Sequence, residues 1–222
     1  MTANQIVRRI VKPVLWVAGL SPLAWMLYAG FTGGLTADPV KGATHFTGRV
    51  VLVILCLTLM VTTIRRFTGW NALIQARRLI GLFAFFYAVI HLLIYFVFDR
   101  GLVFAELGED IAKRPYITVG FTAWIILLSL AVTSPRAMVR RLGRRWQTVH
   151  RLIWVAVPLG LLHFAWAQKQ DLRPTLAYVA LFAIVILLRF ASGSVVAARR
   201  SAAGPAGTSR PAARLDASAD AP

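Results

Sequence analysis

The sequence predicts an all-α integral membrane protein, a bundle of six transmembrane helices with both termini in the cytoplasm. Of its 222 residues, 58% are hydrophobic and only 15% are charged. That leaves too few polar side chains to cover a water-soluble domain of this size. The apolar residues gather in long runs with short arginine clusters between them. This pattern is typical of a multi-pass membrane protein.

The formal net charge of +17 would suggest a nucleic-acid partner if the chain were soluble. Because the cations flank apolar runs, we interpret them as topology signals and expect membrane lipids, and no nucleic acid, beside them. With a cytoplasmic N-terminus, 18 of the 25 Lys and Arg residues fall on the cytoplasmic side and 7 fall outside. The positive-inside rule therefore favours this orientation.

Each predicted span comes close to the roughly 20 apolar residues that a crossing needs. The spans are residues 14–31, 49–64, 79–98, 116–133, 146–169 and 175–190. The first is longer than the apolar core of a signal peptide and is interrupted by Ser21-Pro22. A loop rich in Gly and Pro, 32–48, separates it from the second span, and a polar connection, 67–76, precedes the third.

The second half of the chain alternates an acidic loop with basic connections. The loop 99–115 carries most of the acids, and Ser134-Pro135 ends the fourth span. A run of arginines then leads into the fifth span as a short amphipathic connection, and Arg173-Pro174 precedes the sixth.

We predict one membrane domain, residues 1–190, followed by a cytoplasmic tail, residues 191–222. The tail is rich in Ala, Ser, Gly, Pro and Arg and has no apolar periodicity. Such composition is typical of a disordered segment.

The cysteine content excludes two kinds of redox chemistry. Cys56 is the single cysteine and lies within an apolar run, so the chain has no cysteine pair for a membrane thiol oxidase. It also lacks the Cys-x-x-Cys-His attachment site of c-type haem. Any haem must therefore be bound without a covalent link.

Histidines within the spans are the candidate functional residues, because ionisable side chains inside a membrane are costly and usually functional. His91 and His163 lie in the third and fifth spans, which run in the same direction. With a rise of about 1.5 Å per residue, they lie about 4 and 6 Å outward of the middle of their helices. Two neutral imidazoles at equal depth suit the axial ligation of haem iron. A haem with both axial positions filled transfers electrons and leaves no site for oxygen or substrate.

Each of these histidines also has a simpler role, as a hydrogen-bonded residue between helices. His150 lies about 20 Å from His163, at the cytoplasmic edge, where a histidine needs no special function. The 13-residue spacing places the two about 140° apart around the helix axis, unless Pro158 distorts the helix. His45, in a loop, suits a structural or surface role. Gly160, three residues before His163, provides room either for a flat ring or for close helix packing.

Several motifs at matching separations resemble one family. They are Gly33-Gly34-Leu35, Ala37-Asp38-Pro39-Val40-Lys41, His45-Phe46-Thr47-Gly48-Arg49, Arg77-Arg78-Leu79-Ile80-Gly81-Leu82, Arg114-Pro115-Tyr116-Ile117-Thr118, and Leu142-Gly143 followed by Trp146-Gln147 and His150. Together they resemble MsrQ, the family of haem-binding membrane subunits of the bacterial protein-methionine-sulfoxide reductase system. The resemblance extends from the first span to the sixth and excludes the tail.

The resemblance implies a ferric-reductase-like domain in the bacterial inner membrane that binds haem b and FMN. It implies electron transfer from the quinone pool or a cytoplasmic flavin reductase to a periplasmic molybdopterin-containing methionine sulfoxide reductase subunit, which repairs oxidised proteins. The chain would be the electron-transfer subunit of this heterodimer and not its catalytic subunit. The family's haem ligands map onto His91, His150 and His163.

Other interpretations stay open at this stage. A stand-alone membrane cytochrome b, acting as a ferric or quinone reductase, would share the helices but need a second ligand pair. A transporter or assembly factor without haem would need a broken helix with facing charges. The acidic residues Glu106, Glu109 and Asp110 offer either a docking surface or a merely solvated face. The cytoplasmic arginines hold FMN phosphate or haem propionates, or only contact lipid headgroups.

Overall fold

A computed structural model of the chain describes residues 3–70, 72–168 and 172–202, and every regular element in them is helical. In chain order the elements are α1 (Ala3–Ile6), η1 (Val7–Val11), α2 (Lys12–Thr32), α3 (Pro39–Thr68), α4 (Leu73–Ile94), η2 (Tyr95–Asp99), α5 (Phe104–Lys113), α6 (Pro115–Val132), α7 (Arg136–Leu142), α8 (Arg144–Arg151), α9 (Ile153–Ala167) and α10 (Arg173–Ala202). The elements η1 and η2 are π-helical turns that continue into α2 and out of α4.

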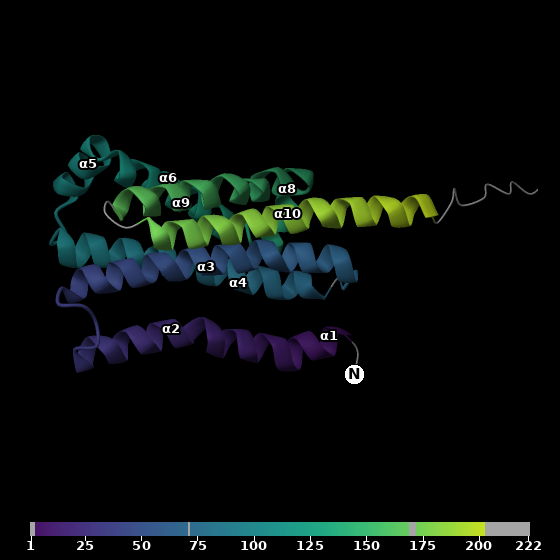
Figure 1. The fold of residues 1–222 in the computed structure, drawn as a ribbon, viewed down its shortest axis with the longest axis horizontal. Coiled ribbons are helices and arrows are strands. Elements are labelled where there is room, and N and C mark those ends of the chain that lie inside the picture. The colour runs from purple at the N-terminus through teal and green to yellow at the C-terminus, as the bar shows by residue number, and fades with distance from the viewer. Residues whose placement is uncertain (1–2, 71, 169–171, 203–222) are drawn as a thin grey trace, which may run out of the picture.

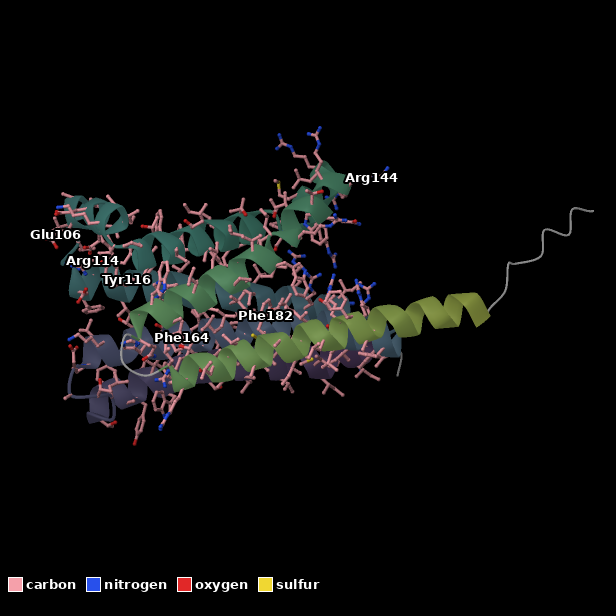
Figure 2. All side chains as sticks on the ribbon, turned by 45° about the horizontal axis from the view of Figure 1, so that its top comes forward. Glu106, Arg114, Tyr116, Arg144, Phe164 and Phe182 are labelled. Atoms are coloured by element: carbon pink, nitrogen blue, oxygen red, sulfur yellow. The ribbon has the colours of Figure 1, made fainter. Side chains whose placement is uncertain are left out.

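Six helical segments within the described ranges are long and apolar enough to cross a membrane, as the sequence predicts. They are Val7–Thr32, Pro39–Thr68, Leu73–Asp99, Pro115–Val132, Arg144–Ala167 and Arg173–Gly193. An even number of crossings brings α1 and the end of α10 to the same end of the bundle (Figure 1). Arg144 lies at this end, which we call the arginine-rich end, whereas Glu106 lies at the opposite, acidic end (Figure 2). That the arginine-rich end faces the cytoplasm stays a prediction.

Two segments predicted as loops are helical. The second span begins at Pro39 instead of residue 49, because the Asp38 carboxylate caps its first turn by accepting the Lys41 N–H at 3.1 Å, and proline suits the first helical position. His45 therefore lies in α3 and not in a loop. The acidic segment 99–115 contains α5, whose apolar residues recur at helical spacing.

The sixth span continues beyond its predicted end, because α10 runs from Arg173 to Ala202 and includes residues 191–202. This stretch holds several alanines and arginines, which favour a helix once an apolar segment has started one. The rest of the predicted tail, 203–222, lies outside the described residues. The division into a membrane domain and a disordered tail stays a prediction.

The hydrophobic core lies between α3, α4, α6 and α9, with Val185 of α10 packed against it. Helix α2 lies at the edge of the bundle (Figure 1) and continues through Pro22, where the sequence suggested an interruption. The fully buried Tyr87 supports this position. Its hydroxyl donates to the Gly19 carbonyl at 2.7 Å and accepts the Leu23 N–H at 3.0 Å. The Tyr87 hydroxyl of α4 thus satisfies a backbone carbonyl and a backbone N–H of α2 next to the proline.

The fifth span consists of two helices, α8 and α9, which meet at Leu152. The Leu152 N–H bonds the Val149 carbonyl at 3.0 Å, a tightened turn that ends α8. Pro158 lies inside α9, so the interruption between His150 and His163 falls six residues before the proline that the sequence pointed to.

Candidate functional site

The imidazoles of His91 and His163 face each other between α4 and α9. Their ring centroids lie 6.1 Å apart, and their planes are almost perpendicular at 88°. The structure thus confirms the expectation, drawn from helix depth, that these two rings meet. Among the described residues, neither ring is paired with an acidic side chain, and both rings lie half-buried at the wall of one cavity.

Backbone carbonyls fix the protonation pattern of both rings. The His163 Nδ1 lies 2.7 Å from the Tyr116 carbonyl, and the His91 Nδ1 lies 3.0 Å from the Thr44 carbonyl. The Thr47 hydroxyl lies 3.2 Å from the same His91 nitrogen. Because a carbonyl can only accept a hydrogen bond, each Nδ1 carries the proton. Each Nε2 therefore keeps its lone pair, which is the form that binds a metal ion.

The separation of the rings matches the geometry of two axial ligands on one metal ion. Bonds from a metal to imidazole nitrogen are about 2 Å long, so two imidazoles on opposite faces of one ion have centroids about 6 Å apart. The observed 6.1 Å agrees with this value. The distance between the two rings is therefore that expected for two ligands of one ion.

A cavity of about 510 Å³ surrounds the two histidines, within the roughly 300–1,000 Å³ of small-molecule and cofactor sites. Helices α3, α4, α6 and α9 form its walls. Most of the wall is apolar and includes Val51, Leu52, Leu55, Leu127, Ala156 and Phe164. Charged groups lie only toward its acidic end, where it is lined by Lys41, Asp99, Arg100 and Arg114. The cavity suits a large apolar group with an anionic edge.

Two glycines lie directly against the rings: Gly48, which belongs to one of the family motifs, and Gly120, which the sequence analysis does not mention. A Cβ atom added to Gly120 would lie 2.5 Å from the His163 Nδ1, and one added to Gly48 would lie 3.2 Å from the His91 Cε1. At Gly120 no side chain fits without a shift of the imidazole or the helix, whereas at Gly48 the contact would be tight. Gly120 follows Tyr116 by four residues, so the two share a helix face. That spacing is the signal that could have identified Gly120.

Gly160 combines the two roles considered for it. It lines the cavity, and an added Cβ would lie 3.3 Å from the Leu52 Cδ2 of α3. Its contact is therefore with a packed helix and not with either histidine ring.

A buried carboxylate, that of Asp110, pairs with two arginines that line the cavity at its acidic end. The Asp110 side chain is 8% exposed and pairs with Arg100 at 2.7 Å and with Arg114 at 2.9 Å. It also accepts a hydrogen bond from the Tyr95 hydroxyl. The hydrogen bond with Tyr95 raises the pKa of Arg100, and hydrogen bonding to Tyr116 raises the pKa of Arg114. Asp110 is therefore a buried residue that holds neighbouring segments together, whereas the Glu106 and Glu109 side chains are exposed.

The donor set fits haem better than a metal held by protein alone. In the part of the chain that the structure describes, no three His, Cys, Asp or Glu side chains gather into a metal cage. Two imidazoles can bind a metal ion stably only if the ion brings further ligands, as haem iron does with its macrocycle. The apolar cavity beside the two rings provides the space for such a group.

The other two histidines lie in different surroundings. His150 stacks on Trp146 with centroids 4.0 Å apart, and its Nδ1 lies 3.3 Å from the Trp146 carbonyl. It is not part of the cavity wall, and the third ligand position implied by the family resemblance stays a prediction. His45 also lines the cavity, toward its acidic end.

We expect His150→Ala to leave haem in the cavity between His91 and His163. The reason is distance, since His150 lies at the other end of the fifth span and outside the cavity wall. The measurement is the haem content of the purified variant by the pyridine haemochrome assay, with Trp146→Leu as a control, because it removes the stacking partner of His150 and keeps the imidazole. A fall in haem per chain in His150→Ala alone would show that His150 is also a ligand.

Comparison with known proteins gives an independent view of the same chain. Residues 47–161 match the family described as ferric reductase like transmembrane component. Three relatives bear the name protein-methionine-sulfoxide reductase heme-binding subunit MsrQ. The one from Ralstonia nicotianae is 47% identical over 82% of this chain and 85% of its own length. Those from Bordetella pertussis and Pectobacterium carotovorum are 43% and 41% identical, over 86% and 85% of this chain and 93% and 94% of their own lengths.

Proposed function

Because the chain belongs to the ferric reductase like transmembrane family and, within it, to the MsrQ heme-binding subunits, we propose that it holds one haem b between His91 and His163. The observation that carries the proposal is the pair of facing imidazoles, each with its Nδ1 committed to a backbone carbonyl. A bound haem supplies one-electron transfer, so the chain serves as the electron-transfer subunit of an oxidoreductase complex.

The residues around the site perform three tasks. His91 and His163 would hold the haem iron through their Nε2 nitrogens, and a haem held in this way would supply one-electron transfer. The apolar walls contributed by α3, α6 and α9 exclude water. The cations at the acidic end, with Lys41 the most exposed of them, offer partners for the propionate groups. These tasks favour rapid electron transfer over bond chemistry.

The partner we propose is a periplasmic, molybdopterin-containing methionine sulfoxide reductase, in a heterodimer with this chain. Reduction of a sulfoxide to a thioether consumes two electrons and two protons and releases water, so the partner needs a source of electrons. With the arginine-rich end in the cytoplasm of a bacterial inner membrane, the cavity lies toward the periplasmic side. The sulfoxide substrate never needs to contact this chain.

The donors proposed are the quinone pool or a cytoplasmic flavin reductase, with FMN as a second cofactor. The cytoplasmic arginine clusters provide cations for the FMN phosphate. A stand-alone cytochrome b with two haems is less well supported, because only one pair among the four histidines of the chain has facing rings.

A spectroscopic reconstitution tests the proposal. The purified chain should show the absorption bands of haem b, sharpen on reduction with dithionite, and contain one haem by the pyridine haemochrome assay. After removal of excess dithionite, the reduced bands should decay when the partner reductase and methionine sulfoxide are both added. Omission of either component is the control. A colourless chain, or bands that stay reduced with both present, would contradict the proposal.

A further inference from the structure

Asp110 of α5 lies where the supports of the two candidate ligands come together. Its carboxylate pairs with Arg100 and Arg114 and accepts a hydrogen bond from Tyr95. It is the buried acid of the acidic end, with a side chain only 8% exposed, whereas the Glu109 side chain on the same helix is 57% exposed. A buried carboxylate with several charged partners fixes their positions relative to one another.

One branch of this network leads to His91. Tyr95 follows His91 by four residues, so it continues the same face of the helix. Its hydroxyl donates to Asp110 and accepts the Arg100 Nε–H at 3.1 Å. The end of the helix that carries His91 is therefore anchored to α5.

The other branch leads to His163. Arg114, which pairs with Asp110 at 2.9 Å, directly precedes α6. Two residues later, Tyr116 accepts the His163 Nδ1–H through its carbonyl at 2.7 Å and stacks its ring against the imidazole, with centroids 6.1 Å apart and planes at 24°. A movement of Arg114 would therefore be transmitted to the His163 ring.

We propose that Asp110 is a positioning residue for both candidate ligands and sets the angle between their imidazole planes. The inference rests on the proposed haem site. Groups that hydrogen-bond or support a metal ligand fix its orientation, and here one carboxylate reaches the supports of both ligands. Removing its charge would leave Arg100 and Arg114 without their common partner. The contacts that support His91 would then no longer be connected to those that support His163.

The test is the electron paramagnetic resonance spectrum of the ferric protein, because the low-field g value of a low-spin haem with two imidazole ligands depends on the angle between their planes. We expect Asp110→Asn to shift this g value while haem remains bound. Glu109→Gln is the matched control, because it removes an exposed acid from the same helix, and its spectrum should equal that of the unmodified protein.

A second variant separates positioning from general stability. Tyr95→Phe removes one hydroxyl, keeps the ring, and should shift the g value in the same direction by a smaller amount. The proposal is overturned if Asp110→Asn binds haem with an unchanged spectrum, or if Glu109→Gln shifts the spectrum equally. If Asp110→Asn loses haem, an unchanged spectrum of Tyr95→Phe overturns it. If the proposed haem site itself is wrong, the result is distinguishable, because the unmodified protein would then give no signal of a low-spin haem with two imidazole ligands.

Discussion

Haem is lost from the chain when either His91 or His163 is replaced by alanine; this is the largest effect that we expect. Under the proposed assignment, each substitution removes one of the two imidazole nitrogens that would bind the iron and leaves the other histidine as the single ligand from this pair. Loss of groups that merely support a ligand already costs about 10–100-fold in metal affinity, so loss of a ligand should exceed that range. The measurement is the ratio of haem absorbance to protein absorbance after purification, with and without dithionite.

His150→Ala serves as the matched control, because it removes the same kind of side chain outside the cavity. Size-exclusion chromatography of all three variants in detergent shows whether the bundle is intact. Bands of normal intensity in both His91→Ala and His163→Ala would refute the assignment of this pair, whatever the behaviour of His150→Ala.

Gly120→Ala should have the second largest effect, although it adds a single methyl group. The new Cβ would lie 2.5 Å from the His163 Nδ1, which is closer than non-bonded atoms approach. The imidazole must therefore rotate or α6 must move, and either change breaks the 2.7 Å hydrogen bond to the Tyr116 carbonyl. Overpacking of this kind costs about 1–3 kcal/mol, so we expect haem to bind about tenfold more weakly or worse. The measurement is haem occupancy in titrations of the haem-free protein.

Two other glycines provide a graded comparison. An added Cβ at Gly48 would lie 3.2 Å from the His91 ring, and one at Gly81 would make an ordinary contact of 3.8 Å with Thr58. Haem occupancy should therefore fall in the order Gly81→Ala, Gly48→Ala, Gly120→Ala, with Gly81→Ala close to the unmodified protein. Equal occupancy in all three would show that space beside the rings is not what these glycines provide.

The sequence predicts the number of spans and the meeting of His91 and His163, for a simple physical reason. Span number follows from the length of apolar runs, and depth follows from the fixed rise per residue of a helix. Two residues at the same depth on parallel spans need only face each other to meet. The ring separation of 6.1 Å shows that they do.

The features that the sequence did not reveal depend on contacts between elements. The burial of Asp110 requires Tyr95 of η2, Arg100 just after η2 and Arg114 between α5 and α6 to converge on one carboxylate. Composition alone does not reveal this, because an acidic loop and an acidic helix can have the same composition. The role of Gly120 depends on which side of α6 faces α9. The sequence of one helix does not determine how that helix is rotated toward its neighbour. The early start of α3 was readable, because Asp38-Pro39 is a capping sequence.

The π-helical turn after His91 makes that part of the chain sensitive to length. In η2 the Arg100 N–H bonds the Tyr95 carbonyl at 3.1 Å, five residues back, so the turn holds one residue more than an α-helical turn would. Deleting one residue there would restore regular winding and swing everything that follows by about 100°, carrying Arg100 away from the carboxylate that it now meets. In relatives of this chain, substitutions in this stretch should therefore be much more common than insertions or deletions.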